Sequence, residues 1–116
     1  PKETNDSFNK LALPSEDGLR LVSFDKIIKC QADRAYCCFF FVDGSKILVS
    51  KPMSAFEHIL VNKHFLKVHK SAIINPQFID KYIRGKNGAL LLSDCSYVPV
   101  SHHYKDELMK ILNHIT

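Results

Sequence analysis

Three hydrogen-bonding side chains in a row, His69, Lys70 and Ser71, form the most distinctive polar stretch of the sequence. The residues just before them alternate between apolar and polar types, which is the two-residue period of a half-buried strand, and the residues after them are apolar. Asn75 precedes a proline and closes the segment, because such a residue avoids helical geometry and asparagine suits turns. The pattern predicts either a polar tip held rigidly for a partner or an ordinary strand–loop–strand with surface polar groups.

A second polar stretch contains Ser101, His102, His103 and Lys105. Apolar residues follow at helical spacing, so Ser101 is expected to cap a final helix over residues 101–115. The first turn of a helix has unpaired N–H groups and favours an anion, and Lys105 adds a fixed charge there. This stretch therefore predicts either a phosphate site or a solvated helix start with two exposed histidines.

The net charge of +4 is unevenly distributed along the 116 residues. Residues 1–25 hold three basic and five acidic groups, whereas residues 26–116 hold 13 basic and seven acidic groups. An excess of positive charge attracts polyanions such as nucleic acid. No apolar run is long enough to span a bilayer.

Catalytic and metal chemistry find little support in the sequence. His64, His69 and Asn75 resemble parts of a metal-dependent nuclease, but Asp80 is the nearest acid and is expected on the next strand. Adjacent histidines on a helix point about 100° apart and seldom share one metal. We expect no enzyme, no metal and no cofactor.

The four cysteines show no metal-binding or redox spacing, so we expect small buried or half-buried thiols in the reducing cytoplasm. They are Cys30, Cys37, Cys38 and Cys95.

The length and the strand patterns predict one domain over residues 10–116, preceded by a frayed terminus or linker end over residues 1–9. The first strand is expected to stop before Pro14, and Asp43-Gly44 is the strongest hairpin signal. A helix is expected over residues 52–61, where Ser54 and Glu57 have the form of a capping box and Pro52 fits a first helical position. The other expected strands cover 19–23, 27–32, 36–42, 46–50, 66–69, 72–74, 78–84, 89–92 and 97–100.

Two motifs make the chain resemble the LytTR DNA-binding domain, the output domain of many bacterial response regulators. The first is the phenylalanine–basic–histidine–polar–serine–asparagine pattern, found here between Phe65 and Asn75. The second is the valine–serine–arginine before the last helix, which appears as Val100-Ser101-His102. The segment from Ile28 to Tyr36 and the Asp43-Gly44 turn also match in order.

The resemblance implies a mainly β fold, an elongated stack of short antiparallel sheets with two short helices. It also implies that loops enter successive major grooves of bent double-stranded DNA. By position, the resemblance assigns DNA contacts to Asp33, Arg34, His69, Lys70, His102 and His103. The chemistry of the same segments adds Lys67, Ser71, Asn75, Ser101 and Lys105 to the expected DNA-binding residues. Lys70, His102 and Asn75 are the candidates for base readout, and His69 is expected mainly to brace its loop.

The chain departs from the family pattern at two contact positions. His102 replaces the usual arginine and loses a permanently charged planar fork that suits guanine. Asp33 would repel phosphate, so we expect Arg34 to make the DNA contact from that loop.

The resulting prediction is a sequence-specific transcription regulator of a two-component system. By resemblance, a receiver domain precedes the DNA-binding domain, and two copies bind direct repeats in a promoter. The alternative is a basic protein-interaction module that docks an acidic partner domain.

Overall fold

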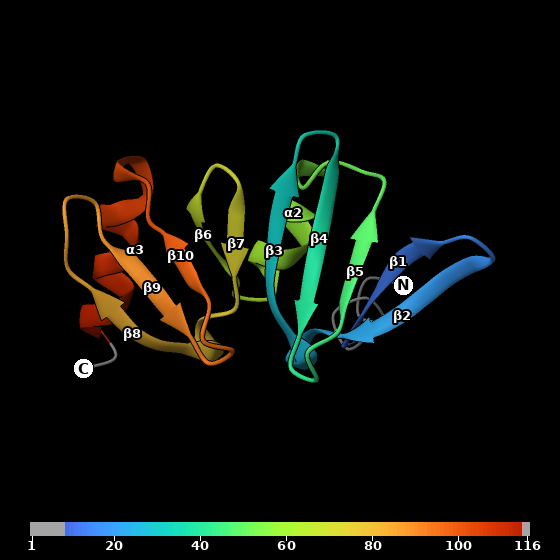
Figure 1. Ribbon diagram of the computed structural model, residues 1–116, viewed down its shortest axis with the longest axis horizontal. Coiled ribbons are helices and arrows are strands. Elements are labelled where there is room, and N and C mark those ends of the chain that lie inside the picture. The colour runs from blue at the N-terminus through green and yellow to red at the C-terminus, as the bar shows by residue number, and fades with distance from the viewer. Residues whose placement is uncertain (1–8, 115–116) are drawn as a thin grey trace.

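The computed structural model describes residues 9–114 as an elongated molecule with principal extents of 44 × 31 × 25 Å. Three antiparallel sheets follow one another along the long axis, and two α-helices pack beside them (Figure 1). The predicted fold class is therefore confirmed. The strands are β1 (Lys10–Ser15), β2 (Gly18–Ser23), β3 (Ile27–Asp33), β4 (Tyr36–Phe41), β5 (Lys46–Val49), β6 (Leu66–His69), β7 (Ala72–Ile74), β8 (Ile79–Ile83), β9 (Ala89–Leu92) and β10 (Tyr97–Pro99). The helices are α2 (Ser54–Asn62) and α3 (His102–His114), with short 3-10 turns η1 (Phe24–Lys26) and η2 (Pro76–Phe78).

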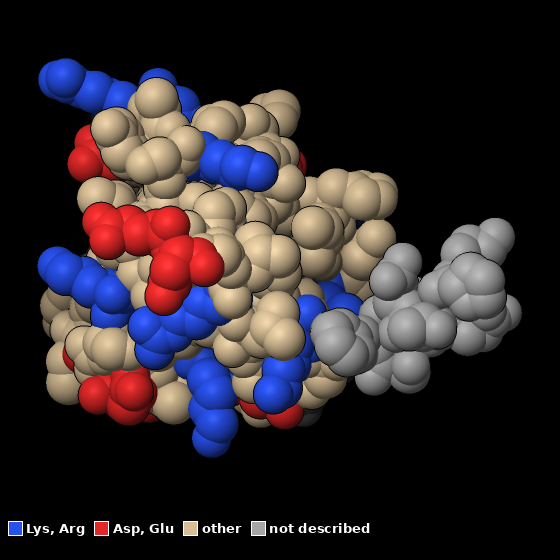
Figure 2. All heavy atoms as spheres, turned by 90° about the vertical axis from the view of Figure 1, so that its right-hand side faces the viewer, with Lys and Arg blue, Asp and Glu red and all other residues tan. Residues whose placement is uncertain are grey.

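The first sheet is the hairpin of β1 and β2. The prediction that the first strand stops before Pro14 is wrong, because β1 continues to Ser15 and Pro14 lies opposite Leu19. A two-stranded hairpin leaves one side of each strand without ladder partners, so a residue without an N–H is tolerated there. Figure 2 views the molecule from this end, where acidic side chains gather in the middle and basic ones lie above and below them.

The central sheet has the strand order β5-β4-β3-β7-β6. As predicted, β4 and β5 are joined at Asp43-Gly44, where Gly44 has a φ of +88° and the Asp43 carboxylate accepts hydrogen bonds from the amide and hydroxyl of Ser45. Cys37 is buried and Cys38 is half-buried on the opposite face, as expected of neighbours on a strand.

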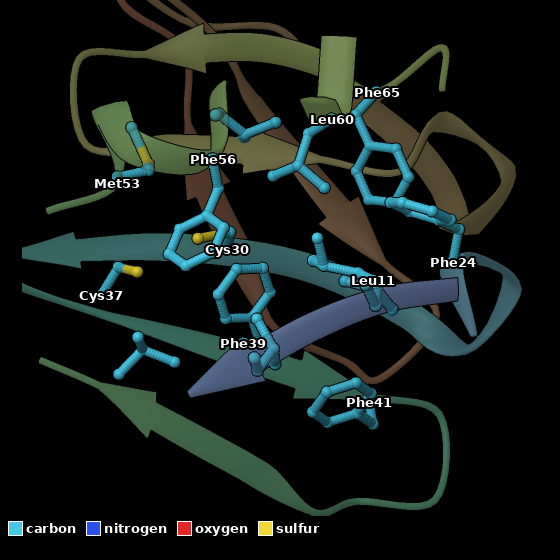
Figure 3. Close-up of a cluster of buried hydrophobic side chains, with 14 residues drawn as sticks. Leu11, Phe24, Cys30, Cys37, Phe39, Phe41, Met53, Phe56, Leu60 and Phe65 are labelled. Atoms are coloured by element: carbon cyan, nitrogen blue, oxygen red, sulfur yellow. The ribbon is translucent and has the colours of Figure 1, made fainter. Parts of the chain in front are cut away.

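Helix α2 covers one face of the central sheet. Phe56 of α2 meets Phe39 of β4 edge to face, with ring centroids 5.2 Å apart (Figure 3). The expected capping box is not formed: Met53 is the N-cap residue, Ser54 is already helical, and no side chain caps the first turn. Glu57 instead pairs with Lys67 of β6.

The third sheet, β10-β9-β8, and α3 enclose a second apolar cluster that includes Ile74 of β7 and Leu108 of α3. Lys29 of β3 links the central and third sheets, although its side chain is only 4% exposed. Its ammonium donates to the hydroxyl of Ser96 across 3.0 Å and lies 4.6 Å from the centroid of the Phe40 ring.

Cys95 does not fit the expectation of buried or half-buried thiols. It is exposed in the turn between β9 and β10, where its φ is +69°. A tight turn at the surface leaves no neighbouring element to cover this side chain.

Candidate nucleic-acid interface

Two backbone hydrogen bonds join the three turns that carry the predicted site. The amide of Ala32, at the end of β3, donates to the carbonyl of Ser71 across 2.8 Å. The amide of Ser101, just before α3, donates to the carbonyl of Val68 across 2.8 Å. The β3–β4 turn, the β6–β7 turn and the start of α3 therefore lie side by side, along the upper edge of the molecule in Figure 1. We call this surface the turn edge.

The β3–β4 turn presents Asp33 and Arg34 at the surface. Arg34 has a φ of +61°, the left-handed conformation that closes the tight connection to Tyr36. Both side chains are exposed, and no ion-pair partner of Arg34 is found among residues 9–114. A free guanidinium at this point is available to an anionic partner.

The β6–β7 turn is closed by the side chain of His69. Its Nδ1 accepts a hydrogen bond from the amide of Ser71 at 3.2 Å and lies 3.0 Å from the Ser71 hydroxyl. Because Nδ1 accepts an amide N–H, a neutral His69 ring carries its proton on Nε2, which remains a donor. Lys70 stands exposed at the tip between these two residues.

Lys67 is held against the neighbouring helices instead of projecting from the tip. Its ammonium lies 3.0 Å from the carboxylate of Glu57 and 5.6 Å from the centroid of the Tyr104 ring. Partial burial alone would lower the pKa of Lys67, but its interactions with Glu57 and Tyr104 outweigh that effect and raise it. Lys67 therefore ties β6 to α2 and α3.

The start of α3 has the predicted N-cap. The hydroxyl of Ser101 accepts a hydrogen bond from the amide of His103 at 3.4 Å, and the Ser101 carbonyl accepts from Tyr104. His102 and His103 are exposed in the first turn, and Lys105 is half-buried just behind them. Imidazoles and a helix N-terminus thus face outward together at the turn edge.

Asn75 lies apart from the other predicted residues. Its side chain is 6% exposed, donates to the carbonyl of Ile27 across 3.0 Å and accepts from the amide of Gln77. Both polar groups are therefore used to start η2 and to fasten it to the entry of β3. This geometry makes Asn75 a structural residue.

Two further basic segments reach the turn edge without having been predicted as part of the site. Lys51 follows β5, whose last residue, Val49, lies opposite Cys37 near the β3–β4 turn. Arg84 and Lys86 lie in the β8–β9 turn, and all three basic residues are exposed. The sequence identified the second segment as a turn, but only the bond from the Val100 amide to the Gly88 carbonyl, at 3.1 Å, shows that it adjoins the start of α3.

Residues 9–114 contain no cluster of three or more His, Cys, Asp or Glu side chains arranged to hold a metal ion. Within the same range, neither helix has the length and apolar character needed to cross a membrane.

The three short antiparallel sheets and the two helices define a small, mainly β domain with exposed basic side chains along its turn edge. Comparison with known proteins makes the class of this domain specific: residues 17–113 match the model of the LytTr DNA-binding domain. The chain belongs to this family, and the predicted resemblance is confirmed.

Two relatives illustrate the match. The sensory transduction protein LytT of Bacillus subtilis (strain 168) is 29% identical over 107 residues, which cover 90% of this chain and 44% of LytT. The chain thus spans less than half the length of that relative. A solved LytTr DNA-binding domain from Bacillus cereus has the same fold, with a TM-score of 0.76 and 22% identity over 90% of this chain and 97% of that one. Family membership favours DNA binding over the alternative of a protein-interaction module.

Proposed function

We propose that the turn edge reads a double-stranded promoter sequence, with its turns entering the major groove, and that the domain is the output unit of a transcription regulator. The observation that carries the proposal is the pair of backbone hydrogen bonds, Ala32 to Ser71 and Ser101 to Val68. These bonds fix three turns relative to one another before DNA arrives. A preorganised surface loses less conformational entropy on binding than three independent loops would.

The proposed roles follow the chemistry of each exposed side chain. Arg34 and Lys105 bind phosphate oxygens, which gives affinity and salt dependence without reading sequence. Lys70 and His102 contact base edges, where nitrogen donors pair with the acceptors of guanine or adenine. Asp33 disfavours phosphate at its own position and thereby helps to set the register of the β3–β4 turn.

The remaining predicted residues position these groups. Ser71 and His69 shape the tip, Ser101 caps α3 and lets His103 face the duplex, and Lys67 braces β6 through Glu57. We leave Asn75 out of the proposed contact set because its polar groups are already bonded within the protein.

The properties of the whole regulator are also proposals. The length of LytT outside the matched region leaves room for a further domain, which we propose is a phosphorylatable receiver. Two copies of this chain would bind direct repeats in the cytoplasm. The domain would act by binding alone, without catalysis.

The test begins with selection of duplexes from a random pool by the purified domain, followed by titration of the selected duplex across a salt series. We expect sequence preference and a steep fall in affinity with salt. Lys70→Ala should weaken binding by about tenfold or more, as expected for loss of a base contact worth about 1–3 kcal/mol.

Lys26→Ala is the matched control, because Lys26 is also exposed and directly precedes β3, at the end of that strand away from the turn edge. Failure to bind any duplex at low salt would overturn the proposal. Equal losses in Lys70→Ala and Lys26→Ala would remove the tip from the interface.

A further inference from the structure

The β8–β9 turn, residues 84–88, is a compact basic projection. Arg84, Lys86 and Asn87 are exposed, and neither Arg84 nor Lys86 has an ion-pair partner in the described part of the chain. The turn itself contains no acidic residue. Two positive charges therefore stand in solvent without internal neutralisation.

The last residue of the turn packs closely against the third sheet. Gly88 has a φ of +88°, which favours glycine, and a Cβ at this position would overlap the ring of Tyr82. Tyr82 itself is half-buried against the second apolar cluster. The contact with Tyr82 thus anchors the end of the turn to the core of the third sheet.

The same glycine connects the turn to the proposed interface. The carbonyl of Gly88 accepts a 3.1 Å hydrogen bond from the amide of Val100, and the next amide, that of Ser101, bonds to Val68. The chain of backbone contacts that joins the three predicted turns therefore continues to a fourth. Figure 1 shows the β8–β9 turn on the same upper edge, next to the start of α3.

We propose that the β8–β9 turn is a fourth DNA contact, in which Arg84 and Lys86 bind phosphate oxygens that flank the sequence read by the other turns. This inference rests on the proposed DNA binding and extends its footprint beyond the start of α3. In a duplex that lies along the turn edge, the β8–β9 turn would contact the DNA backbone at one end of the protein. The contact adds affinity and salt dependence and leaves the preferred sequence unchanged, because phosphates carry no base information.

The test uses the double variant Arg84→Ala/Lys86→Ala and the duplex selected by the unmodified domain. The matched control is Lys10→Ala/Lys26→Ala, which also removes two exposed charges. Lys26 precedes β3 at the end of that strand away from the turn edge, and Lys10 pairs with Ser23 close by. Affinity is measured by fluorescence anisotropy between 50 and 300 mM salt, and the thermal unfolding midpoint of each variant checks that the fold is intact.

We expect the Arg84/Lys86 variant to bind about tenfold or more weakly at low salt, with the slope of log affinity against log salt reduced by about 2. A repeat selection should return the same sequence. In a phosphate-ethylation interference experiment, the variant should lose the interference signal on only one flank of the selected DNA sequence.

A slope and an interference pattern equal to those of the Lys10/Lys26 control would overturn the fourth contact. In that case Lys70→Ala separates the two proposals. If Lys70→Ala still weakens binding more than Lys26→Ala does, only the flanking contact is wrong. A domain that binds no duplex at all refutes the proposed function as well.

Discussion

The backbone amide of Ser71 donates a hydrogen bond to Nδ1 of His69 across 3.2 Å, and the two residues enclose Lys70. In the β6–β7 turn the imidazole thus accepts the amide hydrogen bond that a backbone carbonyl accepts in an ordinary tight turn. It sets the direction in which Lys70 projects. Bracing and DNA contact use different nitrogens of one ring, so they can be separated by substitution.

His69→Asn should retain most of the stability and DNA affinity, because the amide oxygen of asparagine occupies nearly the position of Nδ1. His69→Gln should lose about 1 kcal/mol of unfolding free energy and bind more weakly, since its polar group extends towards the Nε2 position and leaves the Ser71 amide unpaired. Urea unfolding and anisotropy titration measure the two effects. If His69→Asn bound as poorly as His69→Gln while remaining stable, His69 would be a direct contact through Nε2.

Asn75→Ala should lower the unfolding free energy by about 2–3 kcal/mol, because it leaves the buried Ile27 carbonyl and the Gln77 amide without partners. The folded fraction should bind DNA with the affinity of the unmodified domain. Asn75→Asp keeps the acceptor for Gln77 but places a buried carboxylate oxygen against the Ile27 carbonyl, so it should lower the unfolding free energy at least as much as Asn75→Ala. A stable Asn75→Ala protein with weakened binding would return Asn75 to the interface.

The residues near Asn75 also show how far sequence reasoning reaches. Asparagine before proline predicts a turn, and the turn is found, because that preference acts between neighbouring residues. The donation from Asn75 to Ile27 joins positions 48 residues apart, and no local pattern encodes it. Lys67 likewise has the spacing of an exposed strand residue, and only the position of Glu57 on α2 shows that its charge is engaged.

The difference between local preferences and long-range contacts also decides which parts of the fold and of the turn edge can be predicted. Alternation and turn residues predict the hairpins and the final helix, since these depend on local geometry. Whether separate turns share one edge depends on sheet order, which places β7 beside β3 and α3 beside β6. Family resemblance supplied that arrangement for three turns but not for the β8–β9 turn.

His102→Arg should tighten binding to the selected duplex several-fold. A guanidinium is permanently charged and offers two parallel donors to guanine, whereas imidazole offers one donor per nitrogen. Because His102 is exposed, the stability should be unchanged. His103→Arg is the neighbouring control and should gain less. Equal gains in the two variants would mean that charge alone matters and that His102 reads no base.

Ser101→Ala should lower the unfolding free energy by about 0.5–1 kcal/mol, the low end for an N-cap, because the bond to the His103 amide is 3.4 Å long. Ser101→Asn and Ser101→Asp should both restore the cap. Only Ser101→Asp places a negative charge against the phosphates, so it should bind DNA at least tenfold more weakly than Ser101→Asn. Equal affinities of these two capped variants would show that the start of α3 does not face DNA.

Lys29 gives a prediction on pH and stability. Burial lowers the pKa of its ammonium, and the charges of Asp94 and Cys38 offset this only in part. The pKa of Lys29 in the folded protein thus lies below the ordinary value of 10.5. At a pH between these two pKa values, Lys29 is protonated in the unfolded chain and deprotonated in the folded protein. Unfolding free energy therefore rises with pH across that window. Relative to Lys29→Met, the protein with Lys29 should gain stability as the pH rises from 7 towards 10.5.

The measurement is urea unfolding of both proteins at several pH values, each carrying Cys38→Ser so that this neighbouring thiol does not titrate. Lys81→Met, which replaces an exposed lysine of β8, is the control for removal of one lysine side chain. If the difference in unfolding free energy between the protein with Lys29 and Lys29→Met did not change with pH, Lys29 would keep its ordinary pKa. Its bond to Ser96 would then hold a fully charged ammonium between the two sheets without penalty.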